Sequence, residues 1–178
     1  MAITQALAGA VAVVAGATRG AGRGIARALA EAGATVYCTG RSTKGNPSPY
    51  NRPETIEETA EKIAAAGGRA VALRVDHTVE AEVEALFAQV DREQGRLDIL
   101  VNCIAGEDPM MGRSWPFWNA DLTHAETLIR QTVLSRVITA KHGARLMVRD
   151  RRGLIVQVTE NDLLLSSGDV ITQIARFS

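Results

Sequence analysis

The chain has 178 residues, 46% of them hydrophobic, and its 20 basic and 20 acidic residues give a formal net charge of zero. This length can bury a sizeable core in one domain, spanning residues 1–178, but is too short for two domains of ordinary size. Because the charges balance, nothing in the overall composition draws the protein to nucleic acid or to an anionic membrane. The totals therefore favour a small-molecule ligand.

An apolar run occupies residues 6–17 and ends in an Ala-x-Ala-like pattern, as the core of a signal peptide does. No Lys or Arg precedes it, however, and it is shorter than the roughly 18 residues that a membrane-spanning helix needs. We therefore interpret the run as a leading loop and a core strand, and expect no membrane partner.

A strand, a turn and a helix near the N-terminus form the centre of the predicted fold. The strand is a buried parallel one over residues 11–15, the turn is glycine-rich over residues 16–22, and the helix begins near Arg23. The glycines allow a tight bend and a close approach to a ligand, and the helix N-terminus offers free N–H groups to an anion. This arrangement suits a pyrophosphate, although glycine-rich turns also join strands to helices for structural reasons alone.

The second predicted strand spans residues 35–39. A protein that prefers NAD usually carries an Asp or Glu about 20 residues beyond the glycines, where it holds the ribose 2′-hydroxyl. Residues 39–44 read Thr-Gly-Arg-Ser-Thr-Lys and contain no acid. Arg41 and Lys44, with Arg19 from the turn, can instead surround the 2′-phosphate of NADP. The alternative is that they are ordinary solvated loop cations.

Further helices and strands continue the alternation. A loop covers residues 42–53, and Pro53 suits the first turn of the helix that follows. The third strand covers residues 70–75 and the fourth covers residues 97–101. The predicted buried faces are Ile25, Leu29 and Ala32 in the first helix, Ile56, Ala60, Ile63 and Ala64 in the second, and Val83, Leu86, Phe87 and Val90 in a third helix over residues 79–94.

The last third of the chain begins with an apolar, aromatic loop at residues 107–119, which either forms a substrate wall or packs onto the domain. Residues 123–126, Thr-His-Ala-Glu, have the pattern of a capping box that opens a long helix. The fifth strand lies within residues 153–159. The predicted buried stripe of the long helix is Ala125, Leu128, Ile129, Thr132, Val133, Val137, Ala140, Ala144 and Met147.

The Gly-x3-Gly-x-Gly spacing, the run Leu-Asp-Ile-Leu-Val-Asn at residues 97–102 and the pair Ala105-Gly106 together resemble the short-chain dehydrogenase/reductase family. The resemblance runs from about residue 8 to residue 159 and leaves residues 160–178 as a divergent tail. It implies an α/β fold of the Rossmann type, a three-layer αβα sandwich whose parallel sheet has strand order 3-2-1-4-5. The C-terminal strands of the full family fold are missing, as in a truncated or frameshifted product.

The resemblance also implies an enzyme with a nicotinamide cofactor, which transfers hydride between that cofactor and a carbonyl or alcohol substrate. It further implies a homodimer formed through the long helix. The implied cofactor-binding residues are Gly16, Thr18, Gly20 and Gly22 at the pyrophosphate, Arg19, Arg41 and Ser42 at the 2′-phosphate of NADP, Asp76 at the adenine edge, and Asn102, Ala105 and Gly106 at the ribose. An equally open reading makes Asp76 a turn or capping carboxylate before Thr78.

The family's catalytic pair is a Tyr with a Lys four residues later, supported by a Ser after the fifth strand and an Asn in the preceding helix. This chain has only Tyr37 and Tyr50, followed at the fourth position by an Arg and a Glu. Ungapped alignment places Thr159 at the family's Ser and Thr132 at its Asn. Thr159 is thus the remaining catalytic candidate, and a non-catalytic NADP-binding or dimerising protein is the alternative to an oxidoreductase.

Cys38 and Cys103 fall on strands that flank the first strand, too far apart for a disulfide, so we expect free thiols in a cytoplasmic protein. His77, His124 and His142 have no metal-ligand spacing. We expect no metal, and each His at the surface or at a helix terminus.

Overall fold

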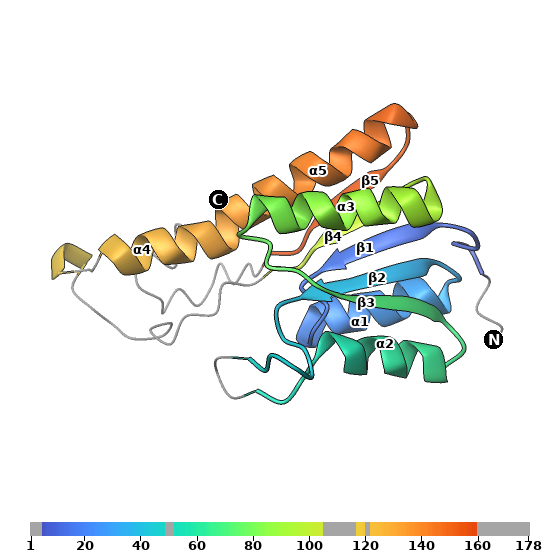
Figure 1. The fold of residues 1–178 in the computed structure, drawn as a ribbon, viewed down its shortest axis with the longest axis horizontal. Coiled ribbons are helices and arrows are strands. Elements are labelled where there is room, and N and C mark those ends of the chain that lie inside the picture. Colours follow the sequence, from blue (N-terminus) through green and yellow to red (C-terminus); the bar gives the residue numbers. More distant parts are fainter. Residues whose placement is uncertain (1–4, 49–51, 105–116, 120–121, 160–178) are drawn as a thin grey trace.

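The computed structural model describes residues 5–48, 52–104, 117–119 and 122–159, and Figure 1 shows a sheet flanked by helices. The elements are β1 (Val11–Ala15), α1 (Gly20–Glu31), β2 (Thr35–Gly40), α2 (Ile56–Ala65), β3 (Arg69–Arg74), α3 (Glu80–Gln94), β4 (Ile99–Asn102), a 3-10 turn (Phe117–Asn119), α4 (Leu122–Ile129), a π-helical segment (Arg130–Leu134), α5 (Ser135–Arg149) and β5 (Leu154–Gln157).

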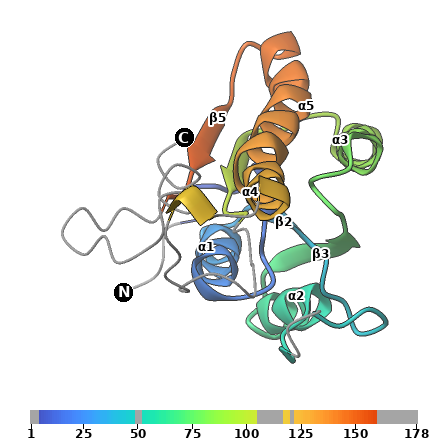
Figure 2. The ribbon, with the colours of Figure 1, turned by 90° about the vertical axis from the view of Figure 1, so that its left-hand side faces the viewer.

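The described sheet is parallel, with strand order β3-β2-β1-β4-β5, which confirms the predicted order. Helices α1 and α2 cover one face, and α3 and α5 cover the other (Figures 1 and 2), which confirms the three-layer αβα architecture. Since all strands run the same way, their carboxyl ends meet at one edge. That edge is where open α/β sheets bind ligands.

The core lies on both faces of β1, because successive side chains of a strand point to opposite sides. Val11 and Val13 pack with residues of α3 and α5, whereas Ala12 and Val14 pack with residues of α1 and α2. A strand buried on both faces reads as a continuous apolar run. The interpretation of this run as a core strand is therefore confirmed, and within the described residues no helix has the length and apolar character to cross a bilayer.

Helices α1 and α2 differ in detail from their predictions. Helix α1 begins at Gly20, not near Arg23, and its fully buried residues are the small ones, because only they allow the helix to approach the sheet closely. Helix α2 begins at Ile56, with Thr55 as its cap: the Thr55 side chain accepts a hydrogen bond from the Glu58 N–H, and Pro53 lies before the helix. The buried residues are Gly22, Ala26 and Ala30 in α1, and Ile56, Thr59 and Ile63 in α2.

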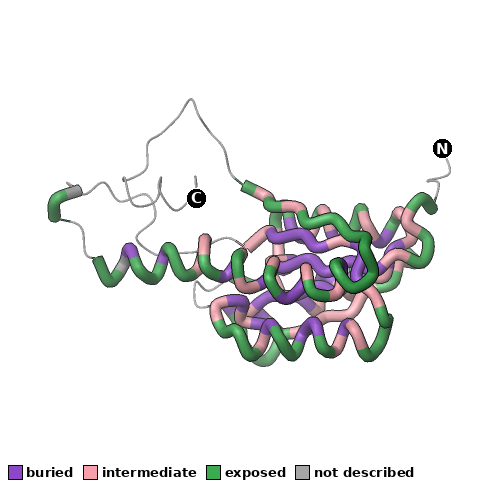
Figure 3. The backbone as a smooth tube through the Cα atoms, turned by 90° about the horizontal axis from the view of Figure 1, so that it is seen from above, coloured by how far each residue is buried: buried purple, intermediate pink, exposed green. Residues whose placement is uncertain are grey.

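The long helix is interrupted by the π-helical segment, which no sequence signal predicted. Thr123 lies inside α4, so the predicted capping box does not start this helix. The extra residue of a π turn rotates the following helix face. The predicted stripe therefore fails at the end of α4 and along most of α5: Ile129 and Val137 are exposed, whereas Met147 is buried as predicted. The face that is buried in α5 consists of Ser135, Thr139, His142, Gly143 and Met147, and Figure 3 shows exposed and buried residues alternating along α4 and α5.

Within the described residues, β5 is the edge strand of the sheet next to β4, and its Leu154 is 56% exposed and its Ile155 is 36% exposed. Cys38 is buried and Cys103 is partly buried, and neither forms a disulfide, as predicted.

Candidate functional site

The glycine turn lies between β1 and α1 at the carboxyl edge of the sheet. The N–H groups of Gly16 and Ala17 both donate to the Thr39 carbonyl at 3.0 Å, so β2 holds the turn in place. Gly16 has φ +87°, and Gly20 has φ +54°, the left-handed region that favours glycine. A tight glycine turn is thus present where the sequence predicted it.

The three glycines meet different steric requirements. A Cβ at Gly16 would clash with the backbone carbonyl of Cys103, and a Cβ at Gly22 would clash with that of Gly16. Gly20 instead faces open space, with no heavy atom within 4 Å of a Cβ built there. Two glycines are therefore required by packing within the protein, and the third leaves the turn accessible to a ligand.

The N-terminus of α1 adds an electrostatic reason for an anion to bind. Arg19, the N-cap residue, makes no side-chain cap hydrogen bond, and the first turn of the helix contains no acidic residue. The first N–H groups of a helix have no partner within it, and its dipole is positive at this end. Because the accessible turn and this helix terminus coincide, the residues fit the diphosphate of a dinucleotide.

Arg23, which sequence reasoning did not single out, joins the glycine turn to α2. Its Nη2 and Nε donate to the Thr18 carbonyl at 2.7 and 3.0 Å, and Nη2 also contacts Glu58 Oε2 at 2.8 Å. The Thr59 hydroxyl donates to the Ala17 carbonyl at 3.0 Å. Bonds from Arg23 and Lys62 lower the pKa of Glu58 to about 2, so its carboxylate is ionised at neutral pH. A polar Thr within the apolar face of α2 was the available sequence signal.

The end of β2 lies against the same turn. A Cβ at Gly40 would come within 2.6 Å of Thr18 Oγ1, and the carbonyl of the buried Ser42 accepts a hydrogen bond from the Ile56 N–H at 3.1 Å. Thr18, Arg41 and Ser42 are thus close together.

Several charged side chains lie around Arg19. Burial, together with the charges of Arg52 and Arg41, lowers the pKa of Arg19, and the charge of Glu54 opposes this effect. Arg19 is therefore influenced by two further arginines and one carboxylate at the junction of the turn, β2 and α2. The ammonium of Lys44, also predicted to join this group, instead contacts Glu61 on α2, because the turn after β2 directs it toward that helix.

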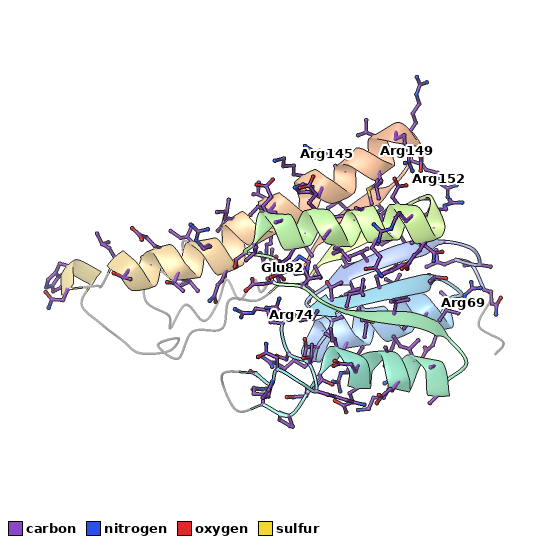
Figure 4. All side chains as sticks on the ribbon, in the orientation of Figure 1. Arg69, Arg74, Glu82, Arg145, Arg149 and Arg152 are labelled. Atoms are coloured by element: carbon purple, nitrogen blue, oxygen red, sulfur yellow. The ribbon has the colours of Figure 1, made fainter. Side chains whose placement is uncertain are left out.

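Asp76 follows β3 at the same edge of the sheet and acts as a turn carboxylate. Its Oδ1 accepts from the N–H and the hydroxyl of Thr78 at 2.9 and 2.7 Å. Burial raises its pKa, but these bonds and the charges of Arg41 and Arg74 outweigh that effect and lower it overall. Arg74 and Glu82, labelled in Figure 4, point toward each other, and Glu82 accepts the Asp76 N–H at 2.7 Å.

Asn102, at the end of β4, is fully buried beside the glycine turn, with Ala15 as its neighbour in β1. Its Nδ2 donates to the Arg136 carbonyl at 3.2 Å, whereas its Oδ1 has no hydrogen-bond partner. Ala105, Gly106 and nearly all of the aromatic loop lie outside the described residues; within that loop, the Trp118 side chain is 83% exposed.

No acid–base pair of the expected kind occurs among the described residues. Tyr37 is buried in β2, donates to Glu93 at 2.6 Å and accepts from Gln94 at 3.1 Å. Burial and the bond to Glu93 raise the pKa of Tyr37 to about 12, which makes it a poor proton donor at neutral pH. Thr132 is buried and bonds to the Leu128 carbonyl, Thr159 is exposed beyond β5, and Tyr50 lies outside the described residues.

The histidine prediction was wrong for His77 and His142, which are both buried. His77 lies between Thr39 Oγ1, 2.8 Å from its Nε2, and Thr139 Oγ1, 2.9 Å from its Nδ1. Its partners are 38 and 62 residues away in sequence, so no local pattern could reveal them. The side chain of His124 is not described, and no three His, Cys, Asp or Glu residues of the described part could hold a metal ion.

The sequence of this chain is similar to those of several known proteins. Residues 10–162 match the sequence model of a protein family, short chain dehydrogenase. Dehydrogenase/reductase SDR family member 1 from Mus musculus is 41% identical over 128 residues, which cover 70% of this chain and 38% of that protein. Uncharacterized oxidoreductase YxjF from Bacillus subtilis is 32% identical over 107 residues, covering 60% and 40%. The chain thus spans about two fifths of the length of these curated relatives.

Solved structures give the same result for the fold. A metagenomic short-chain oxidoreductase in complex with NADP has a TM-score of 0.79 at 26% identity, with 97% of this chain and 72% of that chain covered. A 7α-hydroxysteroid dehydrogenase complexed with NADH and 7-oxo glycochenodeoxycholic acid has a TM-score of 0.73 at 27% identity, with 90% and 56% covered.

Proposed function

This chain belongs to the short chain dehydrogenase family, and from that membership we propose that it is the NADP-binding domain of an oxidoreductase acting on a small carbonyl or alcohol. The observation that supports the proposal is the convergence of an accessible glycine turn, a helix N-terminus and three arginines at the carboxyl edge of the sheet. When bound, the nicotinamide would supply hydride exchange with the substrate carbon.

The chain's own residues would bind and orient the cofactor. The backbone of residues 16–22 would hold the diphosphate, with Thr18 bracing the turn, and Asp76 would lie at the adenine edge. Arg19, Arg41 and Ser42 would hold the 2′-phosphate, which is the basis for preferring NADP over NAD. Asn102, with its free Oδ1, would lie at the ribose, followed by Ala105 and Gly106.

A second candidate is a non-catalytic NADP-binding or dimerising protein. It is favoured because no Tyr of the chain has a Lys four residues later, which leaves Thr159 as the remaining catalytic candidate. Exposed apolar residues on the long helix, Ile129, Leu134 and Val137, support homo-oligomer formation under either proposal. Cys38 and Cys103 form no disulfide, which supports a cytoplasmic location.

Titration of the folded chain with NADPH and NADH, followed by NADPH oxidation against a panel of ketones and aldehydes, separates these candidates. Binding without turnover favours the second, and turnover at about 1 s⁻¹ or faster refutes it. Arg41→Asp should weaken NADPH binding about tenfold or more, because it reverses a charge facing the 2′-phosphate. Arg145→Asp, the same charge change on α5, is the control. Unchanged NADPH affinity in Arg41→Asp would contradict the phosphate assignment.

A further inference from the structure

The N-terminus of α2 is fixed to the glycine turn, which determines where residues 52–55 lie. Arg23 Nη2 reaches the Thr55 carbonyl at 3.5 Å as well as that of Thr18 at 2.7 Å. The Thr59 hydroxyl and the Ile56 N–H add bonds to the turn and to the segment after β2. The residues just before α2 are consequently held beside Arg19.

Glu54 is the acidic residue of this short segment, and its environment is unusual for a surface carboxylate. Its side chain is 27% exposed, yet its Oε2 is shielded from solvent and accepts no hydrogen bond. The guanidinium of Arg52 lies close to that oxygen, with Nε at 3.6 Å. A hydrogen bond from its own backbone N–H lowers the pKa of Glu54; burial opposes this effect, and the charges of Arg52 and Arg19 add to it, so that the pKa is lowered overall. The carboxylate is therefore ionised and influenced by two arginines.

The contact with Arg52 is not that of an optimal ion pair. A carboxylate and a guanidinium often form two parallel hydrogen bonds. Here Arg52 Nε lies 3.6 Å from Glu54 Oε2, which is longer than a hydrogen bond. One carboxylate also carries a single negative charge, whereas Arg41 and Arg52 carry two positive charges between them. A phosphate monoester carries nearly two negative charges and several acceptor oxygens, and would satisfy these guanidinium groups better.

We propose that Glu54 is a built-in counter-anion that competes with the adenosine 2′-phosphate for Arg19 and Arg52, and that Arg52 is a further cation of that site. This inference rests on the proposed binding of NADP. Glu54 then lowers the affinity for the phosphorylated cofactor without a matching penalty for NAD, which lacks the phosphate. The strength of the cofactor preference is accordingly set by residues just before α2 as well as by the turn and β2.

Calorimetric titration of the full chain tests the proposal without any need for turnover. The probes are NADPH, NADH, 2′,5′-ADP and 5′-AMP. Glu54→Gln should raise the affinity for NADPH and 2′,5′-ADP between about twofold and tenfold, the scale of a partly exposed charge interaction, and should not raise it for NADH or 5′-AMP. Arg52→Met should lower the affinity for the two phosphorylated probes. Both effects should shrink as salt is raised from about 0.05 M to about 0.5 M.

Glu84→Gln, which removes the same charge from α3 on the opposite face of the sheet, is the matched control and should change none of the four affinities. Glu54→Ala repeats the test with a different side chain, and thermal melts check that each variant is folded. A lower NADPH affinity in Glu54→Gln, or an unchanged ratio of NADPH to NADH affinity, overturns the inference, since Glu54 would then orient Arg52 or do nothing. If the folded wild-type chain binds none of the four probes, the proposed function itself fails.

Discussion

Acidification should destabilise the protein through His77 before it affects the carboxylates. Thr139 donates its hydroxyl to the Ser135 carbonyl at 2.7 Å, so it accepts from the Nδ1–H of His77, and Nε2 is left to accept from Thr39. Protonation of Nε2 places a positive charge in the core and leaves the Thr39 hydroxyl to donate to the Val14 carbonyl, at 3.3 Å, instead of to the ring. Burial lowers the pKa of His77 to about 4, and the nearby Asp76 and Glu82 offset this only in part.

The size of the effect follows from the difference between the folded and unfolded pKa values of His77, about 4 and about 6.5. The folded state favours the neutral ring, so its stabilising effect is complete above pH 6.5 and is lost as pH falls toward 4. Between pH 7.5 and pH 5 the free energy of unfolding should fall by about 2 kcal/mol. Carboxylates with lowered pKa values, such as Glu58 and Glu80, contribute only as pH falls through about 4.5.

Urea denaturation of wild type and His77→Gln at several pH values from about 7.5 to about 5 measures this difference. The variant should be less stable at pH 7.5 by about 1–3 kcal/mol, because it disturbs two buried hydrogen bonds, but should lose the fall of about 2 kcal/mol on acidification. His142→Gln, which removes the other buried histidine of α5, should keep that fall. If His77→Gln keeps the full pH dependence, the assignment to His77 is wrong.

Three further substitutions test other parts of the structure. Gly22→Ala should abolish nucleotide binding or folding, since its Cβ would clash with the Gly16 carbonyl. Gly24→Ala in the same helix should instead raise stability by up to about 1 kcal/mol. Thermal melts and NADPH titration measure both effects. Asp98→Asn should lower the free energy of unfolding in urea by about 1–3 kcal/mol, because its buried carboxylate accepts the Val11 N–H at 2.9 Å. Asp91→Asn, at an exposed ion pair, should lower it by less than about 1 kcal/mol, and equal losses would contradict this reasoning. Tyr37→Phe should lower stability by about 1 kcal/mol and leave NADPH affinity unchanged, and a loss of affinity would show that this tyrosine has a role at the site.

The layered fold could be predicted because its signals are local. The continuous apolar run of β1 and the alternation of strands and helices indicate a parallel α/β sheet, and the family resemblance supplies the strand order. The glycine turn was predictable for the same reason. The different steric requirements at its glycines could not be predicted, because they depend on the carbonyl groups of Cys103 and Gly16, which only the folded chain brings close.

The missed features depend on contacts between distant parts of the chain. Arg23 reads as an ordinary cation of a helix, and only the docking of α2 gives it the Thr18 carbonyl and Glu58 as partners. His77 reads as a surface residue until Thr39 and Thr139 surround it. The π-helical segment rotates the face of the helix that follows it. A stripe predicted at a constant period therefore misses most of the buried residues of α5, although it includes Met147.

The hydrogen bonds that join Arg23 to the glycine turn and to α2 also determine which part of the chain could be transplanted into another protein. A protein engineer who grafts residues 11–31 onto another parallel sheet would move the glycines but leave behind Glu58 and Thr59, which hold the carbonyl side of the loop. The smallest portable module therefore runs through the end of α2, and a shorter graft would need a new anchor for the guanidinium group.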